Sequence, residues 1–422
     1  MRRRLKKNTF IKLILALLCP VLGQAAEGTF NRELLYIAVK SNHSIQASVA
    51  AVNSAIGESI QAGLLPNPEV VLETENFAGS GNYSGFNSAE FTMGVQQTVE
   101  MGGKRFHRKN AANHATSKIR QQSIARILAI LSEVQFSIVR YTVAKERLVL
   151  SKKRLGLANR THNRVKVRVS AARDSELEHA KVDIEKKIAE IELGKAKKEF
   201  HVAKSQLSRL LGGRIDSTTD LDWVLKFLPA LPEKNTVFQS TSHTSQNKIF
   251  EFNKLRAEAN FKLAQAQAVP NPTIGIGARK FNDNKKTAFL ASLSIPIPIL
   301  DRNQGGIKQA REELVKARAE KEEGMLSIRE EALKTWEEFS TALDEVRIYQ
   351  KNIIPSAKKA YLRASEAFSA GRLSLLNLLD AQRTLIEVQE ARLASILSLH
   401  QAKANMDFLM NSHIDIAMLV IK

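Results

Sequence analysis

The tripeptide Pro-Asn-Pro occurs twice in the 422-residue chain, and each copy separates a helix-like stretch from a strand-like stretch. The first copy lies in LLPNPEV at residues 64–70 and the second in AVPNPTI at residues 268–274. Proline lacks the backbone N–H that a helix requires, and it pushes the residue before it toward extended backbone. A boundary of this kind that occurs twice predicts one structural plan used twice, and this prediction constrains the whole fold.

When the two halves of the chain are aligned on the two tripeptides, they show the same order of predicted elements. In the first half, a helical pattern over about 43–63 precedes the tripeptide, strands over about 69–100 follow it, and a long helical pattern runs to LGG at 211–213. The second half repeats this order with a helix over about 245–267, strands over about 273–298 and a helical pattern to about 410. We therefore predict repeats at 27–212 and 241–410, joined by a linker at 213–240 and followed by a tail at 411–422.

The predicted strands alternate in polarity. Phe91 and Met93 share one face of the strand in AEFTMGVQQTV, and Phe289, Leu293 and Ile295 share one face in TAFLASLSIPI. Alternation of this kind is typical of a half-buried strand. A tilted strand needs about 9–11 residues to cross a bilayer, and each hairpin stands between long helices with no other sheet to pack on. We predict that these five residues face lipid; a pair of ordinary soluble hairpins is the alternative.

The helical patterns are unusually long. From Gly103 to about Ser170 there is no proline, and from Gly306 to about Ala370 the only proline is Pro355. At about 1.5 Å per residue, each run would extend on the order of 100 Å. Apolar residues recur every three or four positions, as in a coiled coil; in the first run they are Ile124, Ile127, Leu131, Val134 and Ile138.

Each long pattern is interrupted near its middle. The interruptions are RVSAARDSELEHAK at 168–181 and AFSAGRLSLLNLLDAQ at 367–382. Gly371 is suited to end a helix and Ser374 to begin one. Each half is therefore predicted to contain a hairpin of two long helices.

The first 26 residues have the order of a secretory signal peptide: six basic residues, an apolar run over 11–22, and then Ala25 and Ala26. Cys19 is the only cysteine, so its removal with residues 1–26 excludes disulfides and thiol chemistry. The net charge then falls from +20 to +14. The remaining basic residues alternate with glutamates along helical patterns, which indicates solvated helix faces and not a nucleic-acid surface.

Residue patterns that would carry catalysis are weak. None of the nine histidines has another histidine at i+4, and His107 and His114 would lie about 10 Å apart on a helix, too far to share a metal ion. The glycine-containing stretches AGSG and MGGKR lack the spacing of a phosphate loop. We therefore predict no enzyme, no cofactor and no metal-ligating residues.

Four stretches between residues 29 and 412 resemble the TolC-type outer membrane efflux family, in particular the channels of cobalt-zinc-cadmium tripartite systems. They are QAGLLPNPEV, EMGGKR, IPIPILDRNQGGI and SAGRLSLLNLLDAQRTL. The resemblance implies an α+β membrane protein: a homotrimer in which each chain gives two hairpins, or four strands, to one outer membrane β-barrel, continuous with an α-helical coiled-coil tube in the periplasm. An oligomer also follows from physics, because four strands cannot close a barrel and open edges are not stable in lipid.

The resemblance also implies roles for particular residues. Hairpin tips that face an adaptor correspond to Ala171, Ala172, Arg173, Gly371, Arg372 and Leu373, although family members usually have glycine where Ala172 stands. The pore entrance corresponds to Asp380, Asn377 and Glu178; a ring of carboxylates there would favour cations. Helix-to-barrel hinges are predicted at Pro66, Asn67, Pro68, Pro270, Asn271 and Pro272, and barrel-to-helix turns at Gly102, Gly103, Asp301, Gly305 and Gly306.

The predicted function is passive conduction of divalent heavy-metal cations across the outer membrane of a Gram-negative bacterium, with most of the chain in the periplasm. The implied partners are two further copies of the chain, outer membrane lipid, a periplasmic adaptor (membrane fusion) protein and an inner membrane resistance-nodulation-division pump, and no nucleic acid. Multidrug efflux and type I protein secretion would use the same duct. A soluble periplasmic coiled-coil scaffold is the alternative from a different class.

Overall fold

The computed structural model describes residues 32–172, 175–213 and 221–421. The predicted signal peptide, with Cys19, lies outside the described residues. Contacts divide the chain into two compact units. One contains the chain up to Ser41, Val134–Leu231 and Thr341–Lys403; the other contains Asn42–Glu133, Pro232–Ser340 and the chain from Ala404. Each unit combines segments from both sequence repeats.

The elements around the two tripeptides follow the prediction closely. Helix α3 (His43–Ala62) precedes strands β1 (Glu69–Glu75) and β2 (Glu90–Thr98), and helix α7 (Ser245–Gln267) precedes β3 (Thr273–Phe281) and β4 (Thr287–Ser294). A short 3₁₀ turn, η1 (Gly81–Tyr83), lies between β1 and β2. Strands β2 and β3 have 9 residues each, within the predicted length of about 9–11, while β1 with 7 and β4 with 8 are shorter. Strand β4 ends at Ser294 because Pro296 and Pro298 have no N–H for a ladder, so Ile295 lies just beyond it.

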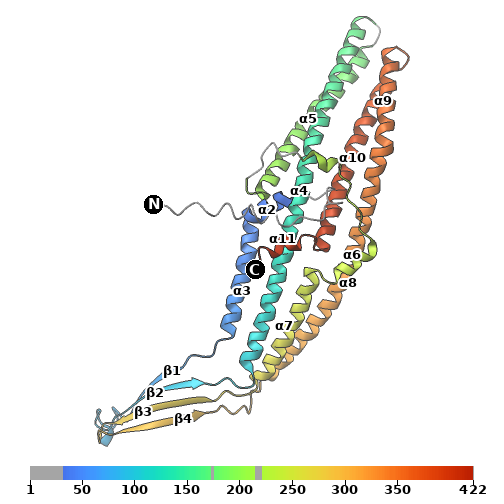
Figure 1. Ribbon diagram of the computed structural model, residues 1–422. Coiled ribbons are helices and arrows are strands. Elements are labelled where there is room, and N and C mark those ends of the chain that lie inside the picture. The colour runs from blue at the N-terminus through green and yellow to red at the C-terminus, as the bar shows by residue number, and fades with distance from the viewer. Residues whose placement is uncertain (1–31, 173–174, 214–220, 422) are drawn as a thin grey trace, which may run out of the picture. The chain divides into compact units, whose positions relative to one another are not determined.

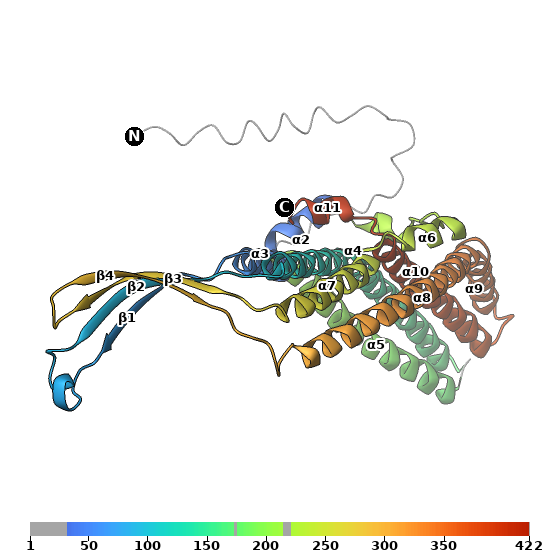
Figure 2. The same cartoon turned by 90° about the horizontal axis from the view of Figure 1, so that it is seen from below.

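The two hairpins form one antiparallel sheet in the order β1-β2-β3-β4 (Figures 1 and 2). Strand β2 pairs with β3 from the other repeat, with Gly94 opposite Gly277 and Val95 opposite Ile276. Strands β1 and β4 are the two edges of this sheet. Each edge strand therefore has one side with no strand beside it among the described residues.

The long helical patterns form the expected helices. Helix α4 (Lys104–Ser170) has 67 residues and is followed by α5 (Glu176–Leu210). The second pattern gives α8 (Gln304–Ile348), a π-helical turn η3 (Tyr349–Ile353), α9 (Ile354–Ser369) and α10 (Leu375–Leu409). The π-helical turn ends two residues before Pro355, whose missing N–H cannot continue the ordinary helical ladder. The predicted apolar stripe of α4, from Ile124 to Ile138, is buried.

A stretch of α4 is long and apolar enough to cross a membrane by composition, but 78% of it is buried inside the protein, as in the core helix of a soluble domain. The strands, in contrast, have many large apolar side chains that are exposed.

The sequence patterns did not predict four short elements. They are α2 (Arg32–Ser41), the 3₁₀ turn η2 (Asp222–Leu225), α6 (Lys234–Thr241) and α11 (Ile414–Met418). The η2 segment is tied to α10: Arg392 Nη2 donates to the Leu225 carbonyl at 2.8 Å, and His400 Nε2 lies 3.3 Å from the Val224 carbonyl oxygen. Burial lowers the pKa of His400 to about 4, so this ring stays neutral at neutral pH.

Candidate functional site

One face of the four-stranded sheet is apolar and exposed. The strand register places Leu72 beside Met93, Val95 beside Ile276, and Ile274 beside Leu293. Phe289 is 92% exposed and Ile276 is 70% exposed. A contiguous apolar surface of this kind marks a contact with lipid or protein. The face contains Val70, Leu72, Phe91, Met93, Val95, Ile274, Ile276, Phe289 and Leu293, and exposed Ile295 follows it.

The opposite face of the sheet is polar and acidic. Glu69, Glu73 and Glu75 of β1 and Glu90 of β2 lie on it, with Arg279 of β3 as its one basic residue. Arg279 contacts Glu75 at 2.5 Å and Glu90 at 2.8 Å. Four carboxylates and one guanidinium give this face three net negative charges. An acidic face opposite an apolar face is suited to a cation-conducting surface behind a lipid-facing wall.

The first predicted hinge, Pro66–Pro68, lies between the end of α3 and the start of β1, and Arg108 of α4 supports it. Arg108 donates to both carboxylate oxygens of Glu100, at 2.5 and 3.0 Å, and to the backbone carbonyls of Ala62 and Leu64. These carbonyls belong to the last turn of α3 and the residues after it, which have no helical partner. The hydrogen bond from Arg108 holds the pKa of Glu100 below its usual value, so the pair stays charged.

The second hinge, Pro270–Pro272, is held by a different set of bonds. The side-chain oxygen of Asn271 accepts from the Met101 backbone N–H at 3.1 Å and from Lys104 Nζ, which also donates to the Val269 carbonyl. Burial lowers the pKa of Lys104. The chain turns beside it at Gly102 and Gly103, both with φ near +70°. A Cβ on Gly102 would also meet Val269 at 3.0 Å, so glycine is required there.

The other predicted strand-to-helix turn lies slightly earlier than expected. Gly305 and Gly306 belong to the first turn of α8, and Asn303, with φ of 55°, makes the turn. Asparagine is among the residues that tolerate this left-handed backbone. Its N–H donates to the Asp301 carboxylate at 2.8 Å, and its side chain donates to the Ala264 carbonyl at 2.8 Å. The prediction is corrected for Gly305 and Gly306, while Asp301 keeps its place in the turn.

The two helical hairpins end as the sequence predicts. Ala171 and Ala172 follow α4, and Ala172 has φ of 55°; Gly371 follows α9 and has φ of 71°. The turn therefore forms even though alanine stands where glycine would be relaxed, at a cost of about 1 kcal/mol. Arg372 is exposed, while Leu373 is half-buried against an apolar cluster. Arg173 lies outside the described residues.

The three predicted pore-entrance residues follow these hairpin ends. Asp380 is exposed and pairs with Arg383 of the same helix at 2.9 Å. Glu178 closes a capping box with Ser175 at the start of α5, and the Asn377 N–H donates to the Ser374 hydroxyl at 3.4 Å. Glu178 thus has a capping role in addition to the predicted one, and Ser-x-x-Glu is the sequence pattern of such a box. A position at a pore entrance stays a prediction for all three.

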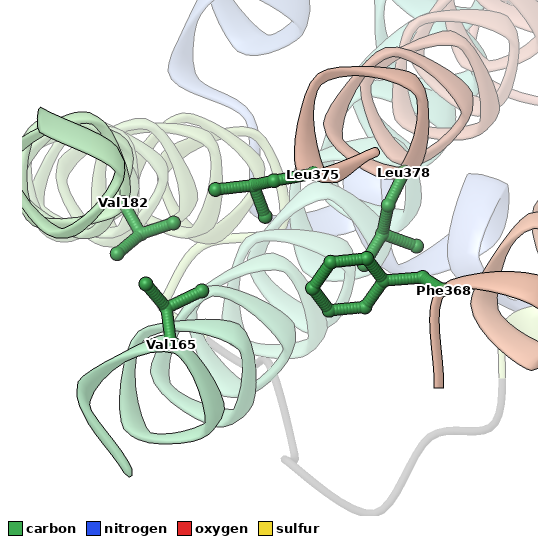
Figure 3. Close-up of a cluster of buried hydrophobic side chains, with 5 residues drawn as sticks. All are labelled: Val165, Val182, Phe368, Leu375 and Leu378. Atoms are coloured by element: carbon green, nitrogen blue, oxygen red, sulfur yellow. The ribbon is translucent and has the colours of Figure 1, made fainter. Parts of the chain in front are cut away.

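A compact apolar cluster joins the two hairpins near their ends (Figure 3). It consists of Val165 of α4, Val182 of α5, Phe368 of α9, and Leu375 and Leu378 of α10. The side chains of Val165 and Val182 point toward each other, and Phe368 lies beside Leu378. This packing fixes the ends of both hairpins in one unit.

Two exposed leucines beside these ends were not predicted from the sequence. Leu177 occupies the second position of α5 and is 64% exposed; Leu376 occupies the second position of α10 and is 68% exposed. They sit at equivalent places in the two hairpins. The sequence signal for them is an apolar residue on the solvent side of a helix start, two residues after a serine that precedes the helix.

The four-stranded sheet, with its exposed apolar face, and the long helical hairpins together give this chain the fold of TolC-type outer membrane channel subunits. The model of the outer membrane efflux protein family matches residues 250–412. Solved outer membrane channels share the fold. MtrE of Neisseria gonorrhoeae superposes with a TM-score of 0.76 at 18% identity, covering 90% of this chain and 88% of that one. CusC superposes with a TM-score of 0.75 at 18% identity, covering 90% and 91%.

Two curated relatives are similar over most of the chain. The cobalt-zinc-cadmium resistance protein CzcC of Cupriavidus metallidurans is 26% identical over 390 residues, which are 92% of this chain and 91% of that protein. The nickel-cobalt-cadmium resistance protein NccC of Alcaligenes xylosoxydans xylosoxydans is 23% identical over 319 residues, covering 75% and 72%.

Proposed function

We propose that three copies of this chain form an outer membrane duct that passively exports divalent heavy-metal cations. The observation that carries the proposal is the two-faced sheet, with an apolar exposed face, an acidic opposite face and two edge strands. The names of CzcC and NccC, which are resistance proteins for cobalt, zinc, nickel and cadmium, support the choice of cargo.

The sheet alone could not remain in lipid, because each unpaired N–H and C=O at β1 and β4 would cost several kcal/mol there. Pairing of β4 in one copy with β1 in the next removes both edges, and three copies close the ring with the apolar face outward. The acidic face would then line the lumen and contribute three net negative charges per copy. Such a lumen concentrates divalent cations and disfavours anions.

The duct needs an energy source and a connection to it. We assign these to an inner membrane resistance-nodulation-division pump and a periplasmic adaptor that docks on the ends of the helical hairpins. Leu177, Leu376 and Arg372 offer exposed apolar and charged groups for that contact. No step in this function requires catalysis by the duct itself.

The proposal is tested by deleting the gene and measuring growth on cobalt, zinc, cadmium, nickel, copper and silver salts and on a set of drugs. We expect a several-fold lower inhibitory concentration for divalent metals, restored by the intact gene on a plasmid. The purified protein should require detergent and run as a heat-modifiable trimer from the outer membrane fraction. Sensitivity to drugs alone would overturn the cargo, and a soluble periplasmic monomer would overturn the duct.

A different cargo has its own support. The pyoverdine export outer membrane protein OpmQ of Pseudomonas putida is 24% identical over 405 residues. A duct for an organic molecule would leave metal resistance unchanged in the deletion strain, so the same growth test separates the two cargoes.

Asp380 gives a second prediction about conduction. If it lines the entrance, Asp380→Ala should weaken the block of single-channel conductance by multivalent cations roughly tenfold, because three carboxylates around one ion are removed together. The measurement is a titration of a trivalent cation in planar bilayers. Glu387→Ala, which changes a carboxylate two turns further along α10 near the same Arg383, is the matched control and should leave the block nearly unchanged. Equal block in Asp380→Ala and in the native protein would place Asp380 outside the entrance.

A further inference from the structure

Three side chains with metal-binding donor atoms meet between α4 and α5, beside the apolar cluster of Figure 3. His162 comes from α4, and His179 and Asp183 lie one turn apart on α5, all within one compact unit. The two imidazole rings have centroids 5.1 Å apart at an interplanar angle of 44°. His162 Nε2 lies 3.7 Å from Asp183 Oδ1.

These distances are close to those of ligands that share one ion. With metal–nitrogen bonds of about 2.0–2.1 Å, two rings on a tetrahedral ion have centroids about 5 Å apart, and two donor atoms lie about 3.4 Å apart. His162 Nδ1 lies 3.4 Å from the Asn163 side-chain oxygen. A proton on Nδ1 directed to that oxygen leaves the lone pair of Nε2 available on the side of Asp183.

His179 supplies the second observation. Its Nε2 atom is buried and has no hydrogen-bond partner among the described residues. A buried ring nitrogen without a partner is costly, and an ion that accepts its lone pair removes that cost. Val165 and Val182, three residues further along each helix, belong to the buried apolar cluster (Figure 3).

We propose that His162, His179 and Asp183 bind one divalent transition-metal cation and that the ion bridges α4 to α5 near the end of the hairpin. Two imidazoles and a carboxylate suit zinc, cobalt, nickel and cadmium, with water in the remaining position. As the side chains stand, no group of three histidine, cysteine, aspartate or glutamate side chains in the described residues is placed to hold a metal ion, so binding requires a side chain to move. The Asp183 side chain is 49% exposed, so it can rotate to complete the group. The site does not depend on the proposed export function, because it rests on the hairpin alone.

The test uses the full-length protein in detergent, stripped of metal with a chelator and titrated with Co²⁺, whose visible absorption reports imidazole ligation. We expect one Co²⁺ per chain, and at least tenfold weaker binding in Asp183→Asn and in His179→Gln. Asp183→Asn keeps the shape of a half-exposed side chain, so it reports on the site even if His179→Gln folds poorly. His114→Gln, on α4 in the other compact unit, is the matched control and should bind as the native protein does.

Thermal unfolding gives a second measurement. An ion that binds only the folded protein stabilises it and raises the midpoint of its thermal unfolding. Zn²⁺ should raise the midpoint of the native protein and of His114→Gln but not of Asp183→Asn. The proposal is wrong if the native protein binds no Co²⁺ in the micromolar range, or if Asp183→Asn and His179→Gln both bind it as tightly as the native protein. Because binding is measured on purified protein and export by growth, failure of one leaves the other to be judged separately.

Discussion

Valine in place of Gly277 is expected to remove nearly all assembled protein from the outer membrane. Gly277 of β3 faces Gly94 of β2, and the two backbones approach closely. A Cβ on Gly277 would lie 2.8 Å from the Met93 carbonyl oxygen and 3.0 Å from the Gly94 Cα. Both neighbours are backbone atoms, so relief requires the strands to separate. Overpacking of this kind costs about 1–3 kcal/mol in a single chain, and a trimer would incur the cost three times.

The effect is measured as the amount of heat-modifiable species in isolated outer membranes. Ser292→Val is the matched control, because it places the same β-branched residue on the same face of β4, where a side chain already stands. It should assemble close to normally. Normal levels of assembled Gly277→Val protein would contradict the pairing of β2 with β3 that joins the two hairpins.

That pairing could not be predicted from sequence alone, although much around it could. The Pro-Asn-Pro repeat placed the ends of α3 and α7 and the starts of β1 and β3 within a few residues, because proline acts on its own backbone and its immediate neighbours. Strand partners depend on residues far apart in the chain, such as Gly94 and Gly277. A glycine within a strand does not indicate which residue of another strand will pair with it, so the sequence did not predict that Gly94 and Gly277 face each other.

In the candidate sites too, features set by neighbouring residues were predictable, and features formed by residues far apart in the chain were not. The turns at Gly102, Gly103 and Gly371 follow from glycine itself and were predicted. The group of His162, His179 and Asp183 has no local signature, because its two histidines lie on the two arms of the hairpin and not on one helix face. Glu178 was placed at a pore entrance from resemblance; its capping bond to Ser175 is a local pattern that the sequence did contain.

The junction between α3 and β1 contains the other large expected effect. Methionine in place of Arg108 keeps the apolar stem but removes the bonds to Glu100 and to the carbonyls of Ala62 and Leu64. The Glu100 side chain is only 10% exposed, so its carboxylate would remain buried without its main partner. Loss of one partner from a buried pair costs about 3–5 kcal/mol, and we expect about 2–3 kcal/mol here because Arg108 itself is one-third exposed.

We expect the lower stability of Arg108→Met to appear as a lower midpoint of thermal unfolding in detergent. We also expect faster proteolysis between residues 62 and 68, where α3 loses its capping bonds. Lys109→Met, the next residue and exposed, should change neither. The pH response gives an independent check. Because the folded-state pKa of Glu100 is lowered from 4.5, the native pair contributes its stability above pH 4.5 and loses it as the pH falls through the folded-state value. Arg108→Met should lack most of that acid-dependent loss; an unchanged midpoint and acid response would show that Arg108 does not support the hinge.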